Sequence, residues 1–134
     1  MTYWIIPANP KIYNIREALH DLKLIDWRQY YNFEVGDIVY IYSSRPESRI
    51  IYKMKVTDIN LTADKSVADR RYWIDPSAFD VSLNNNRFIR LKPIAENETD
   101  LLTLVDLYEH GLRGAPQGAI KLKEPLLSYV IDTL

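Results

Sequence analysis

Tryptophan and tyrosine are the residues of this sequence whose type and setting offer specific chemistry. The chain of 134 residues has three tryptophans and ten tyrosines, and several stand beside charged residues rather than inside apolar runs. Trp27 lies between Asp26 and Arg28, and Trp73 follows Arg71 by two residues. Indole and phenol rings stack on nucleobases, which contributes ~1–3 kcal/mol per base. Both tryptophans therefore predict a surface for planar ligands; the alternative is that each ring closes the end of a small barrel.

Side chains for catalysis are scarce by comparison. The chain has no cysteine and two histidines, His20 and His110, which both fall where a helix is expected to end. A protonated or polar ring at that place interacts favourably with the helix dipole. There is no Gly-x-Ser-x-Gly nucleophile motif, and the glycine-rich segment 111–118 lacks the lysine and hydroxyl of a phosphate-binding loop. We therefore expect a binding protein rather than an enzyme, with no metal and no cofactor.

Charge is balanced over the chain but unevenly distributed. Seventeen basic and eighteen acidic residues give a net charge of −1, so no global field attracts a polyanion. Seven bases and four acids lie between Arg45 and Arg71, and a second basic set comprises Arg87, Arg90 and Lys92. Both sets predict either a local basic face or an ordinary solvated strand surface.

The N-terminal residues indicate where the protein works. They carry no basic region and are interrupted at Pro7, unlike a secretory signal peptide. No apolar run approaches the ~20 residues that a membrane span needs. We expect a cytoplasmic protein with no membrane partner, forming one domain over residues 1–134.

Apolar periodicity predicts strands in the middle of the chain and helices toward its ends. Strands are expected at residues 3–6, 38–42, 49–56 and 87–94, with a short one at 71–74. Helices are expected at 11–22, from Thr99-Asp100 to Gly111 with Leu101, Leu104, Val105 and Tyr108 as its apolar stripe, and from Glu124-Pro125 onward. Residues 25–32 and 60–69 are expected to be loops, and 75–86 to be turn-rich. This order predicts an α+β domain, a small mixed β-barrel flanked by helices.

Three strings and a late segment carry a resemblance to a known family. They are Tyr3-Trp4-Ile5-Ile6-Pro7-Ala8-Asn9, Ile25-Asp26-Trp27-Arg28-Gln29, Val35-Gly36-Asp37-Ile38-Val39-Tyr40-Ile41-Tyr42-Ser43-Ser44 and Gly111-Leu112-Arg113-Gly114-Ala115-Pro116-Gln117. In this order they resemble the EVE domain family of the PUA-like superfamily, which also contains the YTH and ASCH domains. The resemblance implies a small β-barrel flanked by helices, in agreement with the element order.

The resemblance also implies a function and a set of residues. YTH domains and several EVE domains hold a flipped, modified base in an aromatic pocket, and EVE domains occur beside nucleases in modification-dependent restriction enzymes. Trp27 matches the first pocket tryptophan, while Asn9, Ser43 and Ser44 match polar pocket positions. The remaining rings of the cage are open among Tyr30, Tyr42 and Trp73. The cations expected to contact phosphates are Arg45, Arg49, Arg71 and Arg113.

Two other functions stay open. A stand-alone RNA-binding module is compatible with the wider PUA-like group. An ASCH-like protein that binds a small molecule, or acts on one, is a further alternative. We expect modified DNA as the partner, with a fused or neighbouring nuclease supplying any cleavage.

Overall fold

A six-stranded sheet forms the centre of the molecule. The structure, a computed structural model, describes residues 1–84 and 87–134. The strands are β1 (Tyr3–Ala8), β2 (Ile25–Arg28), β3 (Ile38–Ser43), β4 (Arg49–Leu61), β5 (Phe88–Glu96) and β6 (Ile120–Lys121). Their order in the sheet is β2-β5-β4-β3-β1-β6. β1 and β3 run parallel, whereas the other neighbouring pairs are antiparallel, so the sheet is mixed.

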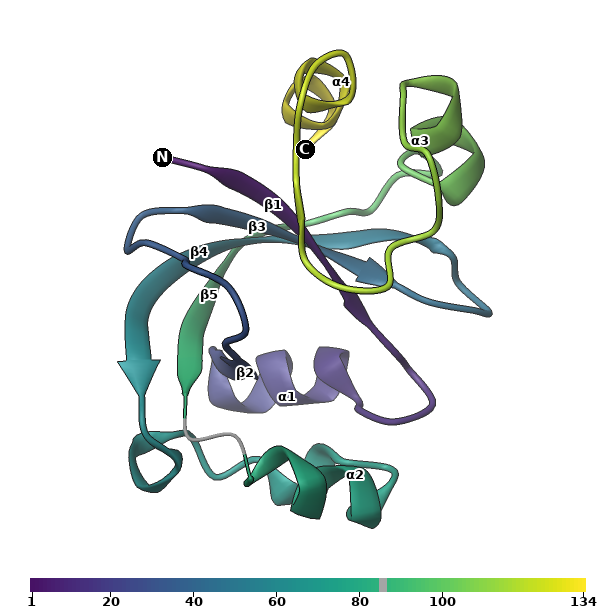
Figure 1. The fold of residues 1–134 in the computed structure, drawn as a ribbon. Coiled ribbons are helices and arrows are strands. Elements are labelled where there is room, and N and C mark those ends of the chain that lie inside the picture. The colour runs from purple at the N-terminus through teal and green to yellow at the C-terminus, as the bar shows by residue number, and fades with distance from the viewer. Residues whose placement is uncertain (85–86) are drawn as a thin grey trace.

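Helices cover both faces of this sheet. The α-helices are α1 (Ile15–Leu22), α2 (Pro76–Ser82), α3 (Leu104–Glu109) and α4 (Leu126–Thr133), and the short 3-10 helices are η1 (Ala63–Lys65) and η2 (Arg70–Tyr72). In Figure 1, α1 and α2 lie on one side of the sheet and α3 and α4 on the other. Among the helices of residues 1–84 and 87–134, none combines the length and the apolar character that crossing a membrane demands.

The central strand β3 separates two hydrophobic cores. All six of its residues are buried. Successive side chains of a strand point to opposite faces. Val39 and Ile41 accordingly pack in the first core with α1, whereas Ile38 and Tyr40 pack in the second core with α3 and α4. A strand covered on both faces needs an almost continuous apolar run, and the sequence of β3 provides one.

The long strand β4 curls the sheet. It pairs with β3 through its first half and with β5 through most of its length. Its register against β5 shifts three times, between Lys53 and Met54, between Val56 and Asp58, and between Asp58 and Leu61. Such irregularities bend a strand and increase its local twist. β4 and β5 therefore sweep round toward α2 and close a half-barrel over α1 (Figure 1).

The predicted α+β architecture is confirmed. The strands expected at residues 3–6, 38–42, 49–56 and 87–94 correspond to β1, β3, β4 and β5, and the last helix is α4 with Leu126 and Val130 buried. The expected helix at 11–22 begins later, at Ile15, because the Asn14 side chain caps it by accepting from the Glu17 amide. His20 and His110 do lie at the C-terminal ends of α1 and α3.

The prediction of a loop at residues 25–32 is wrong for its first half. Residues 25–28 form β2, an edge strand in which Trp27 stands opposite Ile89 of β5. Ile25 and Trp27 alternate with polar residues, but burial does not follow this alternation. Asp26 is buried through an ion pair with Arg90, a partner 64 positions away. Only the tertiary structure supplies that partner.

Residues 70–82 also differ from the prediction. In place of a strand at 71–74 there is the 3-10 helix η2, followed by a single bridge between Tyr13 and Trp73. The segment expected to be turn-rich contains α2, which begins where Asp75 accepts from the amides of Ser77 and Ala78. Within the expected loop at 60–69 lies η1. The predicted turn at 85–86 lies outside the described residues.

The third helix begins four residues later than predicted. Thr103 and Asp106 form a capping box, so α3 starts at Leu104 rather than at Thr99-Asp100. This later start changes the buried face: Leu102 and Leu107 are fully buried, whereas three members of the expected stripe, Leu101, Val105 and Tyr108, are exposed. The predicted end is correct, because Gly111 has a φ of +112° just after the His110 cap.

Candidate functional site

A cavity of about 540 Å³ opens beside α1 and is the candidate site. Its walls come from seven parts of the chain, namely the end of β1 with the β1–α1 connection, β2, Ser44 after β3, the segment from η1 to Trp73, α2, Phe88 of β5 and the loop at residues 116–117. The volume lies within the range of about 300–1,000 Å³ typical of small-molecule sites. Because the half-barrel brings these distant segments together, the cavity depends on the tertiary structure and not on any one motif.

Aromatic rings form one continuous wall of the cavity. The ring of Tyr13 stands at its centre, 5.7 Å from Trp27 and 5.0 Å from Trp73 between centroids, both in edge-to-face geometry. Phe79 of α2 extends the row, 5.8 Å from Trp73. Trp27 and Trp73 are each only partly buried. Such edge-to-face pairs hold rings in fixed orientations, so this wall is preformed for a flat ligand.

Asp69 ties the rings together by hydrogen bonds. Tyr13 donates its hydroxyl to Oδ2 at 3.0 Å, and Trp73 donates its indole N–H to Oδ1 at 3.2 Å. Burial raises the pKa of the Asp69 carboxyl, although these two hydrogen bonds oppose the shift. Burial and the neighbouring Asp69 charge also raise the pKa of Tyr13 far above its usual value. The phenol therefore stays protonated and acts as a donor at all ordinary pH values.

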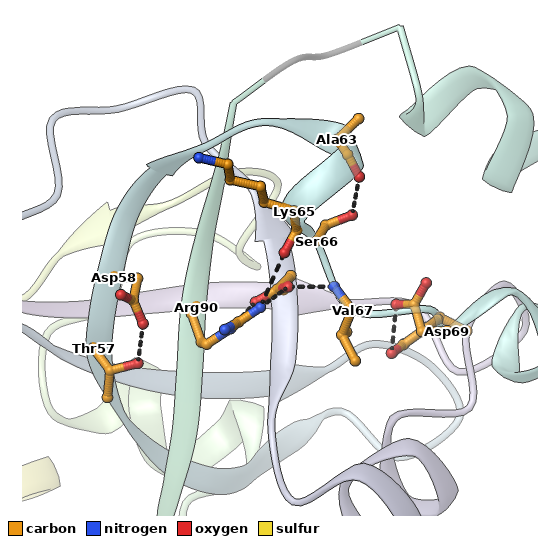
Figure 2. A network of polar contacts seen from close by, with 10 residues as sticks. Thr57, Asp58, Ala63, Lys65, Ser66, Val67, Asp69 and Arg90 are labelled. Carbon is orange, nitrogen blue, oxygen red and sulfur yellow. Dashed lines mark hydrogen bonds and ion pairs between the residues drawn. The ribbon is translucent and has the colours of Figure 1, made fainter.

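A second carboxylate of the cavity, Asp26, holds the segment that carries Asp69. Arg90 forms two hydrogen bonds with it, from Nε at 2.9 Å and from Nη2 at 3.0 Å, and the Val67 amide donates to Oδ2 at 2.6 Å. Arg90 also donates to the Lys65 carbonyl at 3.3 Å. Figure 2 shows how Arg90 reaches from β5 toward Lys65 and Val67. This network fixes the segment 65–69, and with it the position of Asp69, against β2 and β5.

Four of the residues predicted for the base pocket line the cavity together. They are Trp27, Trp73, Asn9 and Ser44. Asn9 stands at the end of β1 and its side chain accepts from the Lys11 amide at 2.9 Å. Ser44 follows β3, where its backbone amide donates to the Ala8 carbonyl at 2.9 Å. The parallel pairing of β1 with β3 thus brings these two polar residues to one rim.

The other predicted pocket residues lie elsewhere. Tyr42 is buried in the second core, on the far face of the sheet, because it has the same side-chain direction as Tyr40. Ser43 is buried and donates to Glu47 at 2.8 Å beside a smaller hollow. Tyr30 is 65% exposed after β2, with the Arg28 guanidinium 5.8 Å from its ring centre.

The four arginines predicted to contact phosphates are not gathered at the cavity. Arg45 and Arg113 are exposed on loops. Arg71 lies 3.9 Å from Asp21 and over the ring of Tyr72. Arg49 donates to the Thr99 carbonyl, and its buried Nε has no hydrogen-bond partner within the described part of the chain.

The cations that do line the cavity are Arg28 and Arg70. Arg70 lies 3.7 Å from Asp80 and over the Phe79 ring. Sequence reasoning missed both as site residues, together with Tyr13, Asp69, Phe79 and the Pro116-Gln117 pair. The available signals were the position of Arg28 beside Trp27 and the place of Gln117 in the last of the resembling strings. Nothing local to Tyr13 or Asp69 marks them, because their roles come from contacts 56 positions apart.

Metal chemistry receives no support from the side chains of residues 1–84 and 87–134. Among them, no group of three or more histidine and acidic residues is arranged to hold a metal ion. The two carboxylates of the cavity, Asp26 and Asp69, are engaged instead with Arg90 and with the aromatic donors.

The curled mixed sheet, with helices on both faces, has the PUA-like fold that the sequence resemblance implied. Solved structures with this fold match almost the whole chain. An ASCH protein from Zymomonas mobilis has a TM-score of 0.70 at 14% identity, with 98% of this chain and 94% of that chain covered. Human THYN1, in a complex with DNA that contains 5-methylcytosine, has a TM-score of 0.65 at 13% identity, with 98% and 96% covered.

A third likeness is to Rpa0253 from Rhodopseudomonas palustris, with a TM-score of 0.63 at 12% identity and with 99% of this chain and 92% of that chain covered. No family model matches the sequence, and no curated protein matches it. At such low identity these likenesses establish the fold, and the function must be argued from the site.

Proposed function

We propose that this chain is a nucleic-acid-binding domain that holds a flipped, modified base in the cavity beside α1. The observation that carries the proposal is the aromatic wall, in which the partly buried Trp27 and Trp73 flank a cavity of about 540 Å³. Polar groups of Asn9, Ser44 and Asp69 share that cavity. A base needs both features, since its faces stack and its edge forms hydrogen bonds.

The free energy gained by stacking is comparable to the cost of extruding the base. Extrusion of a base from a duplex costs a few kcal/mol, least for a base that is already weakly paired. Stacking on an aromatic ring contributes ~1–3 kcal/mol. A methyl group that is buried against the apolar wall adds roughly 0.8 kcal/mol. The domain would therefore favour a methylated base modestly, by less than about tenfold from the methyl group alone.

Cations near the cavity would bind the phosphates on either side of the flipped nucleotide. Arg28 and Arg70 line it, and the exposed Arg45, Arg71 and Arg113 are proposed to extend this contact. Arg49 is left out, because its guanidinium is engaged with the Thr99 carbonyl. Phosphate contacts set the register of a strand without reading its sequence.

Modified DNA is the proposed partner, and human THYN1 offers a parallel, since it has this fold and has been crystallised with DNA that contains 5-methylcytosine. The resemblance to EVE domains extends the proposal: the domain would supply base specificity to a fused or neighbouring nuclease in a restriction system, and would itself perform no chemistry.

Fluorescence anisotropy with labelled oligonucleotides tests the proposal. The probes are DNA strands with one 5-methylcytosine or one cytosine at the same position, and the RNA strand of the same sequence. Trp27→Ala should weaken binding of the methylated DNA about 5- to 150-fold, the equivalent of ~1–3 kcal/mol. The matched control is Trp4→Phe, because Trp4 is buried in the first core and its indole donates to Asp37. This control should lose stability but retain affinity.

Two results would replace this function. If the RNA strand binds more tightly than either DNA strand and Trp27→Ala abolishes that binding, the domain is an RNA-binding module. If the free nucleoside competes as well as the oligonucleotide and salt has little effect, the cavity belongs to an ASCH-like protein for a small molecule, because phosphate contacts make nucleic-acid binding strongly salt-dependent.

A further inference from the structure

The two carboxylates that line the cavity differ in how their charge is compensated. Asp26 is paired with the guanidinium of Arg90 through two hydrogen bonds, and the Val67 amide donates to it as well. Asp69 is 8% exposed, and within residues 1–84 and 87–134 no cation lies in ion-pair contact with it. A buried carboxylate without a cation needs donors from neutral groups. Asp69 has such donors in Tyr13 and Trp73.

The orientation of Asp69 is set by the aromatic wall itself. One oxygen accepts from the Tyr13 hydroxyl and the other from the Trp73 indole, so the carboxylate cannot rotate without losing one of them. Its own backbone amide also contributes. An ionised carboxylate has about four lone-pair sites. At least one acceptor site is therefore left for a further donor, and Asp69 lines the same cavity as Trp27 and Trp73.

We infer that Asp69 is the residue that selects the bound base, by accepting a hydrogen bond from its exocyclic amino group. The inference rests on the proposed function and deepens it. A carboxylate matches the N4 amino group of cytosine, whereas the O4 carbonyl of thymine or uracil presents an acceptor to an acceptor. Methylation at C5 leaves the N4 amino group untouched, so the methyl group and Asp69 read different parts of one base.

5-Methylcytosine and thymine make the matched pair for this inference. Both are pyrimidines with the same C5 methyl group, so they stack alike and fill the same volume, and they differ at position 4 and in the proton on N3. Wild-type protein should bind a DNA strand with one 5-methylcytosine about tenfold or more tightly than the same strand with thymine. Equal affinities for the two strands, in the wild-type protein alone, would overturn the inference.

The variant Asp69→Asn tests the residue. An amide has one oxygen and one NH₂ group, so it presents a donor where the carboxylate presents an acceptor. The ratio of the two affinities should fall to about one or reverse in favour of thymine. A second variant, Tyr13→Phe, removes a donor to Asp69 but keeps the carboxylate and the ring, and it should keep the preference for 5-methylcytosine. If Asp69→Asn retains the wild-type ratio, the inference is wrong.

A failure of the inference can be told from a failure of the proposed function. Trp27→Ala, measured with the same two strands, reports whether the cavity binds a base at all. If binding requires Trp27 but the wild-type protein does not distinguish 5-methylcytosine from thymine, the proposed function is supported and the proposed role of Asp69 is wrong. If Trp27→Ala binds both strands as the wild type does, the function falls and the inference falls with it. A melting curve of Asp69→Asn establishes that the variant is folded; if it is not, the wild-type comparison decides.

Discussion

The buried ion pair between Arg90 and Asp26 offers the sharpest test of the structure. The carboxylate side chain is only 2% exposed and the guanidinium 25%, with Nε and Oδ1 2.9 Å apart. The pair joins β2 to β5, and Asp26 also holds the Val67 amide of the cavity wall. The variant Arg90→Met keeps most of the aliphatic volume of the side chain and removes its charge. It leaves Asp26 buried without a cation.

The cost of this variant follows from the burial of Asp26. Removal of one partner of a buried ion pair destabilises a protein by about 3–5 kcal/mol, because the other charge remains uncompensated. For a domain of this size each kcal/mol lowers the melting temperature by about 4 °C, so we expect a decrease of roughly 12–20 °C. Chemical denaturation with urea, followed by tryptophan fluorescence, measures the free energy of unfolding. Base affinity, measured below the melting temperature, should fall too, because segment 65–69 loses its support.

The matched control is Lys92→Met, which makes the same kind of change two residues along β5 at an exposed position. Its free energy of unfolding should stay within about 0.5 kcal/mol of the wild type. The double variant Asp26→Asn/Arg90→Met should be less destabilised than the sum of its single variants, since it leaves no unpaired charge. If Arg90→Met and Lys92→Met unfold within about 1 kcal/mol of each other, the pair is not buried in solution and the reasoning fails.

Further predictions concern α3 and the pH dependence of stability. Gly111→Ala should lower the free energy of unfolding by at least about 1 kcal/mol, because residue 111 has a φ of +112° and its new Cβ would lie 3.3 Å from the Pro125 ring; an unchanged urea midpoint would contradict this conformation. The hydrogen bond from Arg16 lowers the pKa of Glu47. This pair stabilises the protein above the pKa of Glu47 in the unfolded chain, and the stabilisation disappears as pH falls through that value and the lower folded pKa. Arg16→Ala should reduce this loss of stability at acid pH by less than about 1 kcal/mol, because the pair is exposed and Ser43 still donates to Glu47. Asp69 affects the pH dependence of stability in the opposite direction, because its pKa is raised in the folded protein. Its ionisation lowers the free energy of unfolding as pH rises from the pKa of the unfolded chain through that of the folded protein. Asp69→Asn should abolish this decrease in unfolding curves measured at several pH values.

Much of the fold was predictable from periodicity alone. β3 is a run of apolar and aromatic residues long enough for one strand, and β5 alternates between buried apolar and more exposed basic residues from Ile89 to Lys92. These patterns are local, because a strand or helix repeats its environment every two or about four residues. β2 and η2 escaped prediction, as did η1, α2 and β6. β2 is only four residues long and η2 only three, too short for a repeat to be recognised. β2 depends on a salt bridge to β5, and η2 is held by hydrogen bonds of its neighbours to the β1–α1 connection.

Some residues of the candidate site were likewise predictable from the sequence, and others were not. Trp27 and Trp73 were recognisable because large aromatic residues stand among charged ones, and Asn9 and Ser44 because they end strands in strings that resemble EVE domains. Tyr42 shows the limit of such reasoning. Its type suits an aromatic pocket, but the direction of its side chain follows from the register of β3, and that register turns it into the second core.

The sequence by itself determined the class of the fold and two of the aromatic residues that face the cavity. Only the tertiary structure decided which rings, carboxylates and cations meet there. The physical reason is that the curl of β4 and β5 brings residues 9–13, 26–28 and 63–79 around one volume. Asp69 has one donor, Trp73, in its own segment, whereas its second donor, Tyr13, lies 56 positions away. The burial that raises the pKa of Asp69 follows from the same closure.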